Sequence, residues 1–152
     1  MKSCITLSLV SSLKGGPWVL WDDLADGLKN AAQMGFDMVE LFTEGPKAGM
    51  SNELKDQLNE TGLGVAAVGT GAGKVLKGLT LTDGNPDTRA NALSFIREMI
   101  DFGAEYNAPA IIGSMQGAHG GEVSRDQAIA WLQQSLEEFG EHASRQGVTL
   151  IY

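Results

Sequence analysis

Phe36-Asp-Met-Val-Glu-Leu-Phe42 is an apolar run of strand length that lies between two segments with helical periodicity. The helical segment before it covers residues 22–35, and the one after it covers residues 51–62. A second apolar run follows directly, Gly64-Val-Ala-Ala-Val-Gly-Thr70. Near-continuous apolar strands that alternate with one-faced helices indicate an α/β fold whose parallel sheet is buried on both sides.

The same alternation extends over the rest of the chain. The expected strands are residues 4–10, 36–42, 64–70, 108–114 and 148–152. The expected helices are residues 22–35, 51–62, 85–106 and 124–147. Asn85-Pro86 is typical of an N-cap followed by proline at the first helical position, and Ser124 with Gln127 predicts a capping box. The buried face of the last helix is expected to hold Ala128, Ile129, Leu132, Leu136, Phe139 and Ala143.

Two architectures share this pattern, an open doubly wound sheet of the flavodoxin-like kind and a (β/α)8 barrel. An open sheet normally closes its last strand with a helix, whereas this sequence stops at Tyr152 in the middle of its fifth strand. We therefore expect residues 1–152 to form a single domain, the N-terminal portion of a TIM-type (β/α)8 barrel that is truncated at strand five.

Composition excludes several classes of protein. The 11 basic residues are outnumbered by 19 acidic ones, and the net charge of −8 with no basic stripe argues against a nucleic-acid partner. The apolar runs are too short to span a bilayer, and the first of them has no cleavage site after it, so we interpret it as a strand and expect no membrane partner. The one cysteine, Cys4, fits the reducing cytoplasm.

Gly69-Thr-Gly-Ala-Gly-Lys74 resembles a phosphate-binding loop but fails in detail. A P-loop has four residues between its first glycine and the Gly-Lys pair and a Ser or Thr after it, whereas three residues and Val75 stand here. The dinucleotide-binding spacing fails as well, because its third glycine would fall on Lys74. We expect a flexible loop over residues 71–84, with no helix starting there.

Polar residues at the ends of two predicted strands are the best candidates for a binding site. Glu40 interrupts an apolar strand, where it either pairs with a neighbouring strand or binds a ligand. Ser114, Gln116 and His119 follow the fourth strand, and side chains at the carboxyl ends of parallel strands face a ligand in both candidate folds. His142, on the last helix, is expected at the surface.

Metal and nucleophile patterns are absent from the sequence. The two histidines are far apart and have no His or carboxylate partner at helical spacing. Cys4 is expected on the wrong face of its strand to contribute a ligand. Ser114 lacks the Gly-x-Ser-x-Gly frame of a nucleophile elbow.

Taken together, the segments resemble the xylose-isomerase-like barrel superfamily of sugar phosphate isomerases and epimerases. The likeness covers the whole chain but only the first four and a half units of an eight-unit barrel. It is carried, in order, by Phe36-Asp-Met-Val-Glu-Leu-Phe42, Gly64-Val-Ala-Ala-Val-Gly-Thr70, Asn85-Pro-Asp-Thr-Arg-Ala90, Ile100-Asp-Phe-Gly-Ala-Glu-Tyr106, Ala108-Pro-Ala-Ile-Ile-Gly-Ser-Met-Gln-Gly117 and Gly147-Val-Thr-Leu-Ile-Tyr152.

This resemblance implies a divalent-metal enzyme that moves a proton between adjacent sugar carbons through an enediolate. The metal of a full-length member would be Mn, Mg, Co or Zn. The family's first metal-binding glutamate follows the Leu-Ile-Tyr of strand five and the other ligands come from later strands, so we expect no tight metal binding and no catalysis by residues 1–152 alone. Whether the chain is itself an enzyme therefore stays open.

By position, the resemblance implies a pocket wall for a small sugar or sugar phosphate made of Glu40, Thr70, Ser114, Gln116 and His119. The related abasic-site endonucleases carry metal-binding histidines near the tips of strands three and four, where Thr70 and Ser114 stand here, so DNA repair is not expected. Two alternatives stay open. One is a non-catalytic half-barrel module that binds or assembles through exposed strand edges, as a homo-oligomer for example. The other is a flavodoxin-like nucleotide-binding domain.

Overall fold

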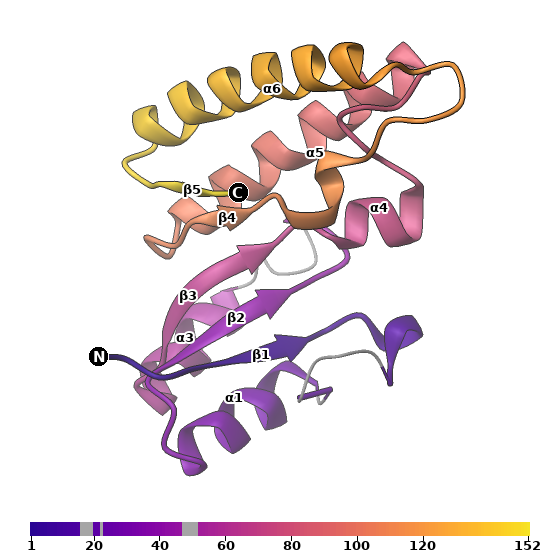
Figure 1. Cartoon of the computed structure of the whole chain (residues 1–152). Coiled ribbons are helices and arrows are strands. Elements are labelled where there is room, and N and C mark those ends of the chain that lie inside the picture. Colours follow the sequence, from indigo (N-terminus) through magenta and orange to yellow (C-terminus); the bar gives the residue numbers. More distant parts are fainter. Residues whose placement is uncertain (16–19, 22, 47–51) are drawn as a thin grey trace.

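The computed structural model describes residues 1–15, 20–21, 23–46 and 52–152, and these form one parallel sheet with helices (Figure 1). The five strands are β1 (Cys4–Ser8), β2 (Met38–Phe42), β3 (Gly64–Gly69), β4 (Ala110–Ile111) and β5 (Leu150–Ile151). The helices are α1 (Leu24–Gln33), α3 (Asn52–Thr61), α4 (Ala72–Lys77), α5 (Pro86–Ala104) and α6 (Arg125–Arg145), with short 3-10 turns η1 (Ser11–Leu13) and η2 (Gly113–Gln116).

Strand order decides between the two candidate architectures. The strands lie in the order β1-β2-β3-β4-β5, each beside its predecessor and parallel to it. A flavodoxin-like sheet instead places its second strand at the edge and its first strand inside, so that the order reverses once. The flavodoxin-like alternative is therefore wrong, and the order is that of consecutive barrel strands.

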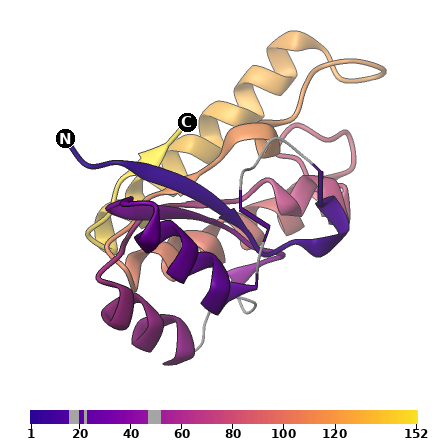
Figure 2. The same cartoon turned by 90° about the horizontal axis from the view of Figure 1, so that it is seen from below.

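One face of the sheet packs on the helices and forms the core. Leu7, Val39, Leu41 and Val68 are fully buried in a single cluster with side chains from four helices. These helical side chains include Leu28 of α1, Leu54 of α3, Ile96 and Phe102 of α5, and Phe139 of α6. Figure 2 shows α1 beside α3, and α5 packs along α6. Burial of these apolar faces holds the sheet on one side.

The other face of the sheet carries the alternate residues, and we call it the open face. Thr6 lies opposite Glu40, Phe42 opposite Gly69, Gly69 opposite Ile111, and Ile111 opposite Ile151. Several of its side chains are half-buried or exposed, whereas their neighbours along the strands are buried in the core. Its members are Cys4, Thr6, Ser8, Met38, Glu40, Phe42, Gly64, Ala67, Gly69, Ile111 and Ile151.

The predicted helix ends are mostly confirmed. The Asn85 side chain accepts a hydrogen bond from the backbone N–H of Asp87, and the Ser124 hydroxyl accepts one from Gln127. Gly147, with φ of +74°, follows α6 as predicted. The first helix differs, because Asp23 is its cap and accepts from the N–H of Asp26. The expected cap Ser51 lies outside the described residues.

Three predictions about elements are wrong. Residues 71–84 are not all loop, since α4 lies there with Ala72 and Gly73 buried and Gly78 ending it in the left-handed conformation. The fourth strand is confined to Ala110–Ile111, because the backbone of Ile112 is already helical and precedes η2 directly. Ile129 is 46% exposed, because it lies on the solvent side of α6 rather than on its buried stripe.

None of the helices in the described part of the chain is both long and apolar enough to cross a membrane.

Candidate functional site: the carboxyl ends of the strands

Glu40 is the one charged side chain within the five described strands. Its partner across the sheet is Thr6, whose hydroxyl donates a hydrogen bond to Glu40 Oε2 at 3.3 Å. Burial raises the pKa of the Glu40 carboxyl above its ordinary value, and the Thr6 hydrogen bond lowers it by less. No cationic side chain of the described residues forms an ion pair with it. Glu40 is thus bonded to a neighbouring strand and still has unused acceptor positions.

Two glycines make room for an aromatic ring beside Glu40. A Cβ on Gly69 would lie 3.0 Å from Phe42 Cδ2 and 3.6 Å from Glu40 Oε1. A Cβ on Gly71 would lie 3.2 Å from Phe42 Cε2 and 3.5 Å from the Ser114 hydroxyl oxygen. The Phe42 ring therefore lies across both glycines, between Glu40 and Ser114. The glycines of the loop that resembled a phosphate-binding motif serve this close approach.

Thr70 is fully buried, and its hydroxyl is already used. It lies within hydrogen-bond distance of two carbonyl oxygens, Ile111 O at 2.8 Å and Ile112 O at 3.0 Å. Both carbonyls belong to the end of β4 and the residue after it, so Thr70 joins the carboxyl ends of β3 and β4. In this site Thr70 therefore stabilises the backbone where β3 and β4 end.

The remaining candidates follow β4. Ser114 is exposed in η2, and Gln116 accepts a hydrogen bond from the Tyr152 hydroxyl at 2.8 Å. His119 is exposed on the loop toward α6, and no hydrogen bond of the described residues connects it to the other candidates. The structure therefore brings Glu40 and Ser114 together around Phe42, links Gln116 to Tyr152, and leaves His119 by itself.

Three residues near the site were not predicted, namely Thr6, Phe42 and Tyr152. Thr6 could have been found from the sequence, because strand alternation places it on the same face as Glu40 once the two strands are aligned. The role of Phe42 depends on the two glycines beneath its ring, which only the register of β2 on β3 reveals.

The residues of the site do not form a metal centre. Cys4 lies on the same face as Glu40, contrary to the prediction, and burial and the Glu40 charge both raise the pKa of its thiol. These two groups have no third partner, since the described residues contain no group of three or more His, Cys, Asp or Glu side chains that could hold a metal ion. A divalent metal therefore has no fitting ligand set in this part of the chain.

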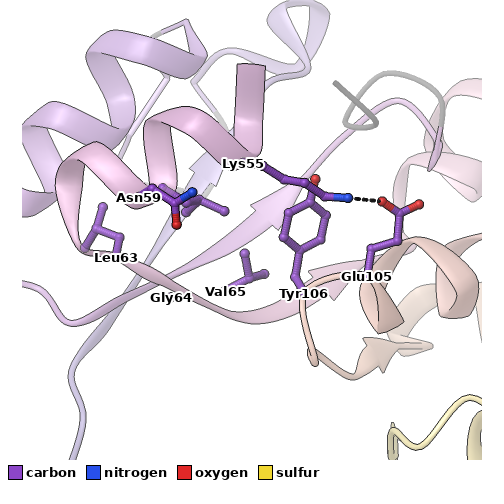
Figure 3. Close-up of a pocket in the computed structure, with 8 residues that line it drawn as sticks. Lys55, Asn59, Leu63, Gly64, Val65, Glu105 and Tyr106 are labelled. Carbon is purple, nitrogen blue, oxygen red and sulfur yellow. Dashed lines mark ion pairs between the residues drawn. The ribbon is translucent and has the colours of Figure 1, made fainter. Parts of the chain in front are cut away.

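A separate pocket lies at the opposite end of the sheet, at the start of β3 (Figure 3). It has a volume of about 330 Å³ and lies between α3 and the end of α5. Lys55 and Glu105 form an ion pair of 3.1 Å across it, beside Tyr106. Burial, and to a lesser extent Glu105, raises the pKa of the Tyr106 hydroxyl. In barrel enzymes this end of the strands serves stability, while the chemistry lies at the other end.

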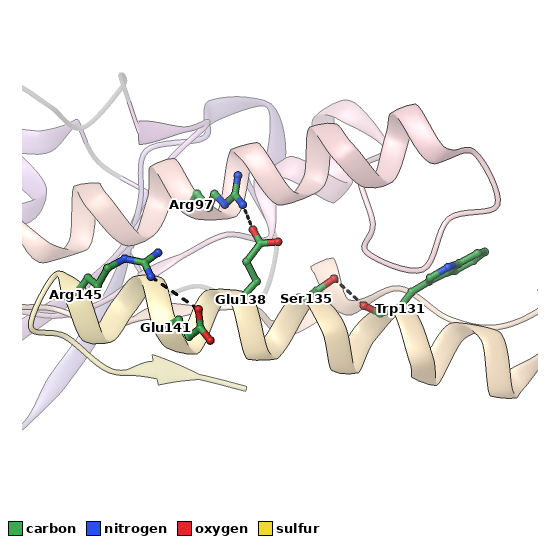
Figure 4. A network of polar contacts seen from close by, with 6 residues as sticks. All are labelled: Arg97, Trp131, Ser135, Glu138, Glu141 and Arg145. Carbon is green, nitrogen blue, oxygen red and sulfur yellow. Dashed lines mark hydrogen bonds and ion pairs between the residues drawn. The ribbon is translucent and has the colours of Figure 1, made fainter.

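Polar contacts between α5 and α6 hold the outer layer (Figure 4). Arg97 pairs with Glu138, and His142 Nε2 lies 2.7 Å from Asp101 Oδ1. His142, which was predicted at the surface, is half-buried, because its ring lies against Asp101 and its side chain is 18% exposed. Arg89 stacks over the Trp131 ring at 3.8 Å, which gives that tryptophan a structural role.

Comparison with known proteins identifies the family to which the chain belongs. The model of the xylose isomerase-like TIM barrel matches residues 28–152. The chain belongs to that family. No curated protein matches the sequence significantly.

Solved structures of the family have the same fold. The 3-keto-D-glucoside 4-epimerase of E. coli is 18% identical and superposes with a TM-score of 0.68 over 99% of this chain and 55% of its own. The D-allulose 3-epimerase of Methylomonas sp., solved with D-allulose, is 18% identical with a TM-score of 0.67, over 99% of this chain and 51% of its own. The D-psicose 3-epimerase of Clostridium cellulolyticum H10, solved with D-tagatose, gives the same identity, TM-score and coverage as the Methylomonas enzyme. The chain thus spans about half the length of these neighbours.

Proposed function

We propose that residues 1–152 supply one wall of the sugar-binding pocket of a metal-dependent sugar isomerase or epimerase. The observation that carries the proposal is the Phe42 ring, which lies on Gly69 and Gly71 between the Glu40 carboxylate and the Ser114 hydroxyl. Sugars present several hydroxyl groups, which the Glu40 carboxylate and the Ser114 hydroxyl can bond, while the Phe42 ring, only 5% exposed and clustered with Val10 and Ala72, is the buried spacer between them. Membership of the family and the names of the neighbours, which are sugar epimerases, support the same substrate class.

The substrate class is a small sugar or sugar phosphate. The solved neighbours hold D-allulose and D-tagatose, both small sugars. In this chain Glu40 accepts hydrogen bonds from sugar hydroxyls, and Ser114 both donates and accepts them. Thr70 supports this wall indirectly, because its hydroxyl bonds to carbonyl groups at the end of β4. Gln116 and His119 are assigned to the same wall only by their position after β4, since the structure joins Gln116 to Tyr152 and neither of them to Glu40.

The reaction of the family, proton transfer between adjacent carbons through an enediolate, requires groups beyond those described here. A bound divalent metal would polarise the sugar carbonyl, but the residues that the structure describes offer it no ligand set. Proton exchange also needs a pair of positioned carboxylates, and the described strands supply Glu40 alone. We therefore expect the 152-residue chain to bind sugar without converting it.

Binding and turnover test this proposal separately. D-Allulose titrated into the 152-residue chain should give saturable NMR shifts at Glu40 and Ser114, because these are the accessible polar residues of the wall. Ser114→Ala should weaken the binding, whereas Glu44→Gln should leave it unchanged, since Glu44 is exposed on the loop after β2. Absence of saturable shifts would contradict the proposed wall. Epimerisation of D-allulose by this chain with added Mn²⁺ would contradict its expected inactivity.

A second candidate is a non-catalytic assembly module, and the exposed end of β5 favours it. Ile151 and Tyr152 are 42% and 66% exposed. The outer edge of β1 is less available, because Ser8 N–H donates to Leu20 O at 3.0 Å and Leu20 N–H donates to Thr6 O at 3.4 Å. A concentration-dependent dimer in sedimentation analysis would support assembly through β5. A monomer at every concentration would count against it.

The proposal also covers where the protein lies in the cell and which partners it lacks. We infer a cytoplasmic protein with no nucleic-acid or membrane partner, from its single cysteine and its net charge of −8. Fractionation of cells that make the protein tests the location.

A further inference from the structure

The pocket at the start of β3 has an apolar side and a polar side that face one space (Figure 3). Leu58, Leu63 and Val65 are buried and form the apolar side. Lys55 of α3 reaches across to Glu105, the residue directly after α5, with 3.1 Å between Nζ and Oε2. The lining comes from α3, the start of β3 and the end of α5, so elements that follow one another in the chain build the pocket.

The Tyr106 hydroxyl lies in the polar side of this pocket without a bond. Its oxygen is buried and has no hydrogen-bond partner among the described residues. The ring packs edge-on against the fully buried Phe102, with 5.5 Å between the ring centres, and this contact fixes the direction of the hydroxyl. Buried polar groups in native proteins nearly always have a partner. A fixed and unbonded hydroxyl in the wall of a pocket therefore indicates a bound molecule that supplies the acceptor.

The size and lining of the pocket favour an organic molecule over water. Its volume of about 330 Å³ lies in the range of small-ligand sites and is far more than one ordered water needs. Water against the apolar side gives up hydrogen bonds there, so that side favours a ligand with an apolar body. The polar side requires an acceptor oxygen on the same molecule.

The charges at the pocket favour an uncharged ligand. Lys55 and Glu105 already neutralise each other, so an anion would be repelled by Glu105 and a cation by Lys55. An amide avoids both, because its oxygen accepts from the Tyr106 hydroxyl and its N–H donates to the Glu105 carboxylate. Burial, and to a lesser extent Glu105, raises the pKa of the Tyr106 hydroxyl, so this group stays a donor at neutral pH.

We propose that this pocket binds an uncharged small amide with an apolar body, whose oxygen accepts a hydrogen bond from Tyr106 and whose body lies on Leu63 and Val65. The pocket lies at the end of the strands opposite the sugar-binding wall, so this inference does not rest on the proposed function. Because this end of a barrel serves stability, the ligand should stabilise the fold without entering the reaction.

Benzamide is the probe, with benzoate and benzylamine as charged compounds of similar size. Titrated into the chain at neutral pH, benzamide should give saturable NMR shifts at Leu63, Val65 and Tyr106. It should bind about threefold more tightly than either charged compound, or more, because only the charged ones meet a like charge. Shifts that do not saturate, shifts centred on Ser114 instead, or a charged compound that binds the wild type most tightly would each contradict the proposal.

Glu105→Gln tests the charge argument directly. This variant leaves the Lys55 ammonium without its carboxylate partner, so the pocket gains a net positive charge. It should therefore bind benzoate more tightly than benzamide, the reverse of the wild-type order. An unchanged order would show that the ion pair does not select the ligand and would count against the proposed class.

Tyr106→Phe removes the hydroxyl and keeps the ring. The free variant should resist urea better than wild type, because a buried unbonded oxygen is lost, whereas its benzamide affinity should fall about three- to tenfold. Tyr152→Phe is the matched control, since Tyr152 is the only other tyrosine and its hydroxyl bonds to Gln116. It should leave benzamide binding unchanged. A Tyr106→Phe chain that is less stable than wild type would show that the hydroxyl is bonded within the chain, and one with unchanged benzamide affinity would show that it is not the donor. Either result would overturn the proposal.

Discussion

At the scale of single residues, Glu40 is the most informative position because its charge is half-buried. Burial raises its pKa in the folded state, so the folded chain holds a proton that the unfolded chain releases. Stability from this group is therefore fully present below the ordinary glutamate pKa and is lost as pH rises through the raised value. Glu40→Gln cannot ionise, and it should be more stable than wild type at pH 7 and similar to it in acid.

Urea unfolding of both chains across this range measures the difference. Glu44→Gln, at an exposed loop position, serves as the control and should show no such trend. A wild-type chain that gains stability relative to Glu40→Gln as pH rises would contradict the assignment.

Thr70 is the candidate site residue whose structural role can be measured by protein stability, apart from any role in ligand binding. Its hydroxyl is buried and lies close to the carbonyls of Ile111 and Ile112. Thr70→Val keeps the shape of the side chain and leaves these acceptors less satisfied, so unfolding should become easier by about 1–2 kcal/mol. Thr61→Val, whose hydroxyl bonds within its own helix turn, should cost less. Denaturant titration of the two variants makes the comparison, and equal costs would argue against a bridge between β3 and β4.

At the scale of elements, the closeness of α5 to the sheet depends on one glycine. A Cβ on Gly103 would lie 2.5 Å from the carbonyl oxygen of Ala108 and 3.1 Å from Val68 Cγ2. Gly103→Ala must push the helix away from the backbone and should destabilise the protein by about 1–3 kcal/mol. Gly140→Ala is the matched change on α6, where no atom lies within 4 Å. It should stabilise by about 0.5–1 kcal/mol, because alanine is the better helix former. Thermal unfolding of both variants measures the contrast, and equal effects would show that α5 does not need this contact.

At the scale of the whole molecule, one cluster joins the strands to four helices, so we expect a single cooperative unit. Phe139→Ala removes a fully buried ring of α6 and should lower stability by about 3–5 kcal/mol. The tryptophan fluorescence and helical circular dichroism of the variant should still change together in urea. Ile129→Ala, on the exposed side of the same helix, should stay within about 0.5 kcal/mol of wild type. Separate transitions for the two signals would divide the chain into more than one unit.

The same three scales show how far the sequence can be interpreted. Helix ends such as Asn85 and Ser124 were predictable because a cap is a local signal within four residues. Helix α4 was missed because Gly71 offers no capping side chain and the helix is held by tertiary packing. Fold class followed from the alternation of apolar strands and one-faced helices, and the family followed from the order of the segments.

The sequence by itself determined the parallel α/β fold, the family and the presence of Glu40 in an apolar strand, because periodicity and residue type are local properties. Only the tertiary structure decided the order of the strands, which excludes the doubly wound sheet, and the register that places Thr6 opposite Glu40. It also decided that Thr70 supports β4, that His142 faces Asp101 rather than solvent, and that Phe42 lies on two glycines. These are contacts between residues far apart in the chain, and no local pattern records which of the many partners a side chain will meet.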